Sequence, residues 1–197
     1  MYKVVEHFFD EAQMGLLIEE ARSRYAESEL LRLEEHELIA QGHFYSPCHY
    51  RSSEPGPLLE ELRHGEPVAQ ILKECFEVEV TPLTGSYNHY AVGDYIGIHR
   101  DAPDCNFTAL IALSPHIGPL SLFPDLARLD NSELYTRLKS TRALGEVVQL
   151  DLPFGSITVI EGSVVPHSRP PVQVECTLAT MCFTAKRAPP IHAGADA

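Results

Sequence analysis

Three residues of the sequence are suited to hold a metal ion together: His99, Asp101 and His167. His99 and Asp101 stand two residues apart at the end of a strand-like run, and residues two apart on a strand point to one face. His167 would come from a different strand, in the apolar run that follows Gly162. Two imidazoles and one carboxylate on one side of an octahedral ion leave the opposite positions open, an arrangement that suits iron(II).

The residues around this triad resemble the 2-oxoglutarate/iron(II) oxygenases. That family commonly approaches its His-x-Asp motif through Tyr-x-x-Gly, and here these positions are Tyr90 and Gly93. Pro166–Val172 is similar to the Pro-His-x-Val-x-Pro-Val segment of the prolyl-hydroxylase-like branch, and Asn88 with Tyr90 matches the Asn-x-Tyr of the AlkB-like branch. The resemblance covers about half of the chain, from Tyr87 to Phe183.

The resemblance implies a reaction as well as a fold. It implies Fe(2+) and 2-oxoglutarate as cofactors, with ascorbate as a reductant, and O2 as the oxidant. The reaction would hydroxylate or otherwise oxidise a C–H bond of a small molecule (an amino acid or natural-product intermediate) or of a peptidyl side chain. Asn88 and Tyr90 would contact the co-substrate; the alternative is that both simply belong to a strand.

One position departs from the family pattern. About ten residues beyond the distal His, most members carry an Arg or Lys that pairs with the far carboxylate of 2-oxoglutarate. Here that position is Thr177, and the resemblance implies that Thr177 belongs to the co-substrate site although it carries no charge. We expect Arg169 to supply the charge, to the co-substrate or to an acidic substrate group, because it lies two residues after His167 and would share its face. The alternative is that Pro170 and Pro171 turn the chain and leave Arg169 in solvent.

The missing cation leaves other functions open. The chain could be a jelly-roll Fe(II) oxygenase that does not use 2-oxoglutarate, or a non-catalytic metal-binding or ligand-binding module. Residues 99–106, HRDAPDCN, also fit the protein-kinase catalytic-loop pattern HRDxxxxN. We interpret that match as a coincidence because the glycine-rich loop, the strand lysine and the DFG aspartate of a kinase are missing.

The elements that would position the triad change in character along the chain. Residues 10–25 and 57–75 have helical patterns, the second after Pro55-Gly56-Pro57, and 125–142 could contain a helix as a lid or a plain surface connection. Residues 43–51 would line a substrate mouth or pack in the core. Short β-branched or aromatic runs, typical of strands, cover residues 76–80, 87–98, 107–113, 120–123, 147–152, 156–160 and 174–183.

These patterns predict a mainly β chain with flanking helices, and the resemblance implies a double-stranded β-helix, the cupin-like jelly roll. We expect a single oxygenase domain over residues 1–187, with a helical N-terminal part at about 1–77 and a jelly-roll core at about 78–185. Residues 188–197, which are rich in Pro, Ala and Gly, are expected to form a disordered tail.

The composition indicates in which compartment the protein resides and which kinds of partner it binds. Fifteen basic and twenty-eight acidic residues give a formal charge of -13, which disfavours nucleic acid as a partner. The five cysteines are widely spaced and lack a CxxC pair, so we expect reduced thiols in a cytoplasmic protein. No run is long enough to span a bilayer, and nothing in the sequence indicates an oligomeric state.

Overall fold

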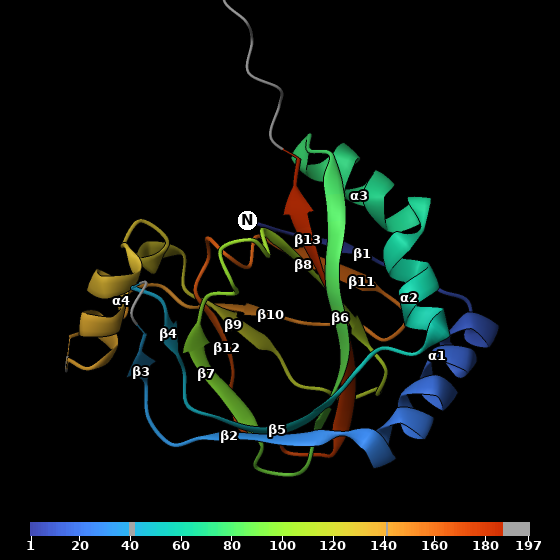
Figure 1. Ribbon diagram of the computed structural model, residues 1–197, viewed down its shortest axis with the longest axis horizontal. Helices are drawn as coiled ribbons and strands as arrows, with labels where there is room; N and C mark the ends of the chain where they lie inside the picture. Colours follow the sequence, from blue (N-terminus) through green and yellow to red (C-terminus); the bar gives the residue numbers. More distant parts are fainter. Residues whose placement is uncertain (40–41, 141, 187–197) are drawn as a thin grey trace, which may run out of the picture.

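The strands form one strongly curled antiparallel sheet (Figure 1) in a computed structural model that describes residues 1–39, 42–140 and 142–186. Along the sheet the order is β1-β11-β8-β13-β6-β5-β7-β12-β9-β10, and β2 adds to β5. The eleven strands are β1 (Tyr2–Val5), β2 (Glu29–Leu33), β5 (Cys48–Ser53), β6 (Val80–Tyr90), β7 (Tyr95–His99), β8 (Phe107–Ala112), β9 (Leu120–Leu122), β10 (Val148–Leu150), β11 (Ile157–Ile160), β12 (His167–Arg169) and β13 (Cys176–Ala185).

Strand β5 closes the curl. Its residues Arg51–Ser53 pair with β6, while Cys48 and His49 pair with β7. The sheet therefore folds into two facing layers, one containing β8, β13 and β6 and the other containing β7, β12, β9 and β10. This is the double-stranded β-helix that the resemblance implies. A separate two-stranded ladder joins β3 (Glu37–Leu38) to β4 (Phe44–Tyr45).

Helices cover the outer face of the first layer. They are α1 (Glu11–Arg24), α2 (Pro57–His64) and α3 (Glu66–Phe76). Asp10 caps α1 through a capping box with Gln13. The single helix expected over 57–75 is two, because Pro67 cannot donate the backbone bond that would continue α2 and instead suits the first turn of α3.

Side-chain alternation in β8 and β13 separates two cores. Phe107, Ala109 and Ile111 face the helices, together with Ala179, Met181 and Phe183 of β13. The intervening Leu110, Ala112 and Leu178 face the interior of the curl. Because side chains alternate between the two faces of a strand, β8 and β13 pack against the helices on one face and form part of the cavity wall on the other.

The insertion between β9 and β10 contains η2 (Pro124–Leu126) and α4 (Asn131–Leu138), so the helix expected within 125–142 is present. Leu134 of α4 packs with Phe44, Phe123 and Leu126 in a third cluster. None of the helices within residues 1–39, 42–140 and 142–186 has the length and apolar character that a membrane span needs.

Three expectations need correction. The first third of the chain is not only helical, because it also contains strands β1 to β5 and the short η1 (Tyr25–Glu27). Strand β2 was missed because its sequence, ELLRL, does not alternate between apolar and polar residues. The strand expected over 76–80 is wrong, because α3 runs to Phe76 and ends at a left-handed Glu77. The cysteines are not all reduced, because Cys105 and Cys182 form a disulfide across 77 residues, a distance at which spacing carries no signal. The expected tail, 188–197, lies outside the described residues.

Candidate metal centre

The structure brings His99, Asp101 and His167 together at one end of the curled sheet. His99 ends β7, His167 begins β12, and the two are direct partners in the antiparallel ladder. Their ring centroids are 4.3 Å apart, and Oδ1 of Asp101 lies 3.6 Å from Nε2 of each ring. The three ligand atoms lie within 4.8 Å of one another, a spacing that one metal ion can bridge.

Both histidine rings are oriented by main-chain carbonyls. Nδ1 of His99 lies 2.9 Å from the carbonyl oxygen of Gly97, and Nδ1 of His167 lies 3.0 Å from that of Val165. A proton on each Nδ1 satisfies these bonds and leaves each Nε2 lone pair free for a metal. Burial, and then the neighbouring His167, lower the pKa of His99 to about 4, so its ring is neutral at pH 7.

Asp101 is held from the side away from the histidines. The Thr108 hydroxyl donates to Oδ2 of Asp101, and the Asp101 backbone N–H donates to Gly162 O at 3.0 Å. A Cβ at position 162 would collide with Oδ2 of Asp101, so only glycine allows the carboxylate this position. Oδ1 is thereby turned toward the two Nε2 atoms.

The triad opens into a cavity of about 200 Å³ inside the curl. Thr108, Leu110, Leu120 and Leu178 form part of its wall, and Tyr90, Arg169 and Asn88 reach it as well. Tyr90 stacks on Tyr50 with ring centroids 5.2 Å apart. Burial raises the pKa of Tyr90 to about 12, so its phenol stays protonated.

Arg169 is buried in this cavity, with 2% of its surface exposed. The alternative in which the prolines leave it in solvent is wrong. An irregular register between β12 and β7 accompanies its inward placement. Nη1 donates to Ile117 O at 2.7 Å, and Cζ lies 5.2 Å from the centre of the Tyr90 ring. Nη2 is buried and has no hydrogen-bond partner among the described residues.

Asn88 is the centre of a neutral hydrogen-bonding group on the cavity wall. Its Oδ1 accepts from Ser52 at 2.9 Å, and its Nδ2 donates to Thr180 at 2.9 Å. Ser52, Asn88 and Thr180 come from β5, β6 and β13, three neighbouring strands. Both residues of the Asn-x-Tyr pattern, Asn88 and Tyr90, therefore face the same space as the metal triad.

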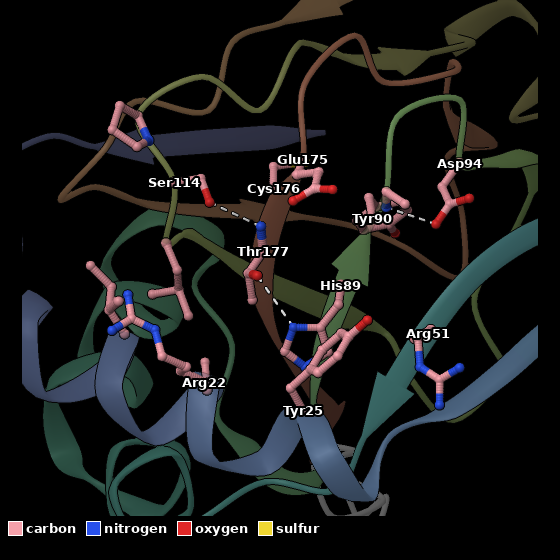
Figure 2. A pocket seen from close by; sticks show the side chains of 15 residues that line it. Arg22, Tyr25, Arg51, His89, Tyr90, Asp94, Ser114, Glu175, Cys176 and Thr177 are labelled. Carbon is pink, nitrogen blue, oxygen red and sulfur yellow. Dashed lines mark hydrogen bonds between the residues drawn. The ribbon is translucent and has the colours of Figure 1, made fainter.

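Thr177 does not line this cavity, so the co-substrate role expected for it is wrong. Leu178 and Thr180 line the cavity, so Thr177 points to the opposite face of β13. Its hydroxyl lies 3.2 Å from Nδ1 of His89 in a separate outer cavity (Figure 2), whose wall also includes Arg51. An Arg or Lys here would point away from the metal.

Arg100 shows why the kinase-like pattern is a coincidence. This buried guanidinium donates to the carbonyl of Val164 and to three carbonyls of the insertion, and to the Asn131 side chain at 3.0 Å. It ties the insertion to the strand that carries His99. The residue between the two motif ligands therefore has a structural role.

Several residues of the site carried no recognisable sequence signal. Thr108 and Gly162 contact Asp101 only through tertiary structure, and Ser52 and Thr180 belong to strands of unremarkable composition. Tyr50 lies in the aromatic segment 43–51, for which a substrate mouth and core packing were both open. It both lines the cavity and packs on Tyr90.

Solved structures share this fold at low sequence identity. A prolyl-4-hydroxylase of Pseudomonas putida aligns with a TM-score of 0.62 at 18% identity, over 94% of this chain and 92% of that one. An oxidoreductase described as a 2OG-Fe(II) oxygenase, from Burkholderia pseudomallei, gives 0.64 at 15% identity, over 93% and 84%. HygX from Streptomyces hygroscopicus, solved with nickel, 2-oxoglutarate and hygromycin B, gives 0.61 at 11%, over 93% and 82%.

No protein-family model matches the sequence, and no curated protein matches it. The likeness to solved structures shows the fold, and it agrees with the jelly roll that the resemblance implies.

Proposed function

We propose that the chain is a non-haem Fe(II)- and 2-oxoglutarate-dependent dioxygenase that oxidises a C–H bond of a small molecule or of a peptidyl side chain. One observation carries the proposal: Arg169, whose buried Nη2 has no hydrogen-bond partner among the described residues, lines the same cavity as a His-Asp-His triad. Solved oxygenases of the same fold support the same chemistry.

The donor set fits iron(II). Two imidazole nitrogens and one carboxylate oxygen form the triad, and the described lining of the cavity contains no thiol. This combination with open positions is the one used by non-haem iron(II) oxygenases. His99, Asp101 and His167 would hold the metal.

The cavity also fits a carboxylate. Arg169 is the only cationic side chain in the described lining. A buried N–H without a partner costs about 1–3 kcal/mol, and an anionic ligand removes that cost by accepting the bond. A ligand with an oxo-acid group at one end and a carboxylate at the other would satisfy both the metal and Arg169, as 2-oxoglutarate does.

When bound, iron(II) and 2-oxoglutarate would supply the oxidising power, through decarboxylation of the oxo acid with O2. The chain's own residues would orient the co-substrate and exclude water from it. Arg169 would hold the far carboxylate in a fixed direction, and the Tyr90 phenol would offer a neutral donor beside it. Leu110, Leu120 and Leu178 make part of the cavity wall apolar, which disfavours water beside the bound co-substrate.

Arg169→Gln tests the assignment. Because a charge-assisted hydrogen bond contributes about 1.5–3 kcal/mol, we expect the KM for 2-oxoglutarate to rise roughly tenfold or more. Succinate formation from labelled 2-oxoglutarate with iron(II), measured without a prime substrate, gives the KM. Arg32→Gln is the matched control, since Arg32 pairs with Glu34 on the exposed surface, and its KM should equal that of the wild type.

The outcomes separate the alternatives. No succinate from the wild-type protein, although iron(II) binds, would favour an oxygenase or binding module that does not use 2-oxoglutarate. An unchanged KM in Arg169→Gln would remove Arg169 as the anchor. If only the KM of a later-identified substrate rises, Arg169 contacts that substrate instead.

A further inference from the structure

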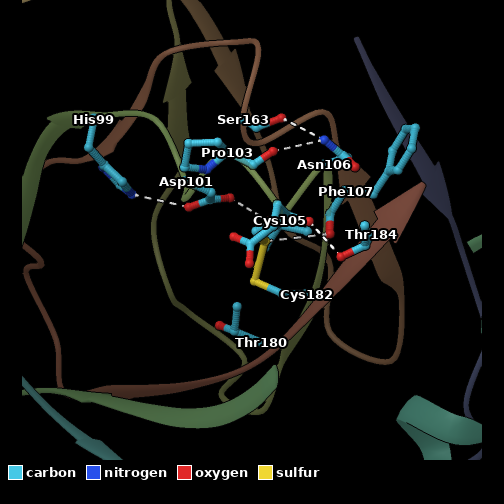
Figure 3. The surroundings of a disulfide bond; sticks show 12 residues. His99, Asp101, Pro103, Cys105, Asn106, Phe107, Ser163, Thr180, Cys182 and Thr184 are labelled. Carbon is cyan, nitrogen blue, oxygen red and sulfur yellow. Dashed lines mark hydrogen bonds and ion pairs between the residues drawn. A yellow bond between two sulfur atoms is a disulfide. The ribbon is translucent and has the colours of Figure 1, made fainter. Parts of the chain in front are cut away.

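The loop between β7 and β8 carries Asp101 and is fastened by a disulfide. Cys105, four residues after Asp101, is bonded to Cys182 of β13, and their Cα atoms are 5.3 Å apart (Figure 3). Cys182 pairs in register with Thr108 of β8. The cross-link therefore joins the loop to β13, which lies beside β8 in the sheet.

Thr108 connects the disulfide to the metal triad. Its hydroxyl oxygen lies 3.3 Å from Sγ of Cys105 and 4.0 Å from Sγ of Cys182, and the hydroxyl donates to Oδ2 of Asp101. A hydroxyl has one proton to donate, and a disulfide sulfur has none. While the disulfide is intact, the Thr108 proton is therefore committed to Asp101.

The surroundings leave this group little space. Thr108 is 3% exposed and Cys105 is 2% exposed. Breaking the disulfide adds two S–H hydrogens against the Thr108 hydroxyl and gives it a new donor to accept from. It also removes the covalent link between the loop and β13, so that only hydrogen bonds such as those from Thr184 to Asp104 O (2.7 Å) and from the Ala185 N–H to Asn106 Oδ1 (2.8 Å) still hold the loop to β13.

We propose that Thr108 is a positioning residue for Asp101, and that the Cys105–Cys182 pair sets metal affinity through its redox state. The cross-linked form holds Asp101 toward the two histidines and binds the metal more tightly than the dithiol form. The inference rests on the metal site of the proposed function, and not on its use of 2-oxoglutarate.

The redox step is a two-electron exchange. A dithiol reductant transfers two electrons and two protons to the disulfide, which yields two cysteine thiols and the oxidised reductant. Hydrogen peroxide reverses the step: two thiols become the disulfide and the peroxide becomes two waters. Cys182 is the more exposed residue of the pair, because it is half-buried whereas Cys105 is 2% exposed.

Anaerobic titration with Mn(II), followed by the electron paramagnetic resonance signal of the free ion, measures affinity without turnover. Mn(II) is chosen because it prefers oxygen and imidazole ligands and disfavours thiols, so the freed cysteines do not compete. We expect the oxidised protein to bind roughly tenfold or more tightly than the reduced protein, as is usual when a residue behind a metal ligand is lost. Alkylation and mass spectrometry establish the redox state of each sample.

Variants separate the two parts of the inference. Cys105→Ala/Cys182→Ala should bind as the reduced protein does in both conditions. Thr108→Val should bind weakly in both, whereas Thr108→Ser should restore tight binding to the oxidised form. Cys75→Ser is the control, since Cys75 is an exposed free cysteine on α3, and it should respond as the wild type does.

Three results would overturn the inference. Equal Mn(II) affinity in oxidised and reduced protein excludes redox control, and full affinity in Thr108→Val excludes the positioning role. Failure of Cys105 and Cys182 to cross-link in peroxide excludes the pair itself. Absence of Mn(II) binding in every form contradicts the metal site, whereas tight binding without succinate formation contradicts only the use of 2-oxoglutarate.

Discussion

At the metal triad, each donor atom is directed by a bond on the opposite side of the same group. The two imidazoles are fixed through Nδ1 by carbonyls two residues earlier in the chain, those of Gly97 and Val165, and Asp101 is fixed through Oδ2 by Thr108. Such support reduces the freedom that the ligands would otherwise lose on binding a metal. The positions that direct the ligands are consequently as sensitive as the ligands.

Gly162→Ala tests this sensitivity without changing a ligand. The added methyl group would collide with the Asp101 carboxylate and displace it. The methyl group would also lie 2.7 Å from Oγ1 of Thr108, which holds that carboxylate. We expect Mn(II) affinity to fall by roughly tenfold or more. Gly15→Ala is the matched control: a Cβ there meets nothing within 4 Å, and the helix should gain about 0.5–1 kcal/mol. Equal metal affinity in both variants would contradict the argument.

At the scale of elements, the sequence predicted best where a strand has a strict pattern. Residues 107–113 and 174–183 were predicted as strands and correspond to β8 and β13, and the HxD pair was correctly expected at a strand end. Strand β5, which reads CHYRSS, has no alternation to detect, although it closes the sheet. Its formation depends on its partners β2, β6 and β7, which only the fold brings together.

The residues of the site also divide into those that the sequence indicates and those that only the fold reveals. His99, Asp101 and His167 could be found because metal ligands are restricted in type, and Arg169 because of its spacing from His167. Thr108 could not be found from local sequence, since its contact with Asp101 depends on how the β7–β8 loop returns. Thr177 was placed wrongly because a count along the chain ignored which face of β13 each residue occupies.

On the outer face of the sheet, His89 of β6 contacts Thr177 of β13, and the buried position of His89 predicts that the stability of the protein depends on pH. Burial, and then Arg51, lower the pKa of His89. A histidine whose pKa is lowered in the folded state contributes stability above its unfolded pKa of about 6.5, and this stability is lost as the pH falls below that value. Urea unfolding at pH 7.5 and pH 5 should show a larger loss for the wild type than for His89→Gln. An equal loss would show that His89 does not contribute.

At the scale of the whole molecule, the charge is strongly unbalanced. The formal net charge of -13 includes 28 acidic residues, and compact folding brings these charges near one another. The acidic balance disfavours the phosphate backbone of nucleic acids.

The same imbalance predicts that salt stabilises the protein. Raising NaCl from about 10 mM to about 150 mM shortens the Debye length from about 30 Å to about 8 Å and screens the repulsion between acidic groups. We expect the Tm to rise by roughly 2–4 °C for each kcal/mol gained. Calorimetry with KCl as a matched salt excludes a specific effect of sodium. A constant or falling Tm would contradict the prediction.

The direct pairing of His99 with His167 has a consequence for the order of folding. The two residues are far apart in the sequence, so the pair exists only after β12 has closed onto β7, a long-range step that is slow in sheets of this kind. Before that step the chain offers at most His99 and Asp101 to a metal. A metal ion should therefore slow unfolding of the finished protein but leave the rate of refolding nearly unchanged.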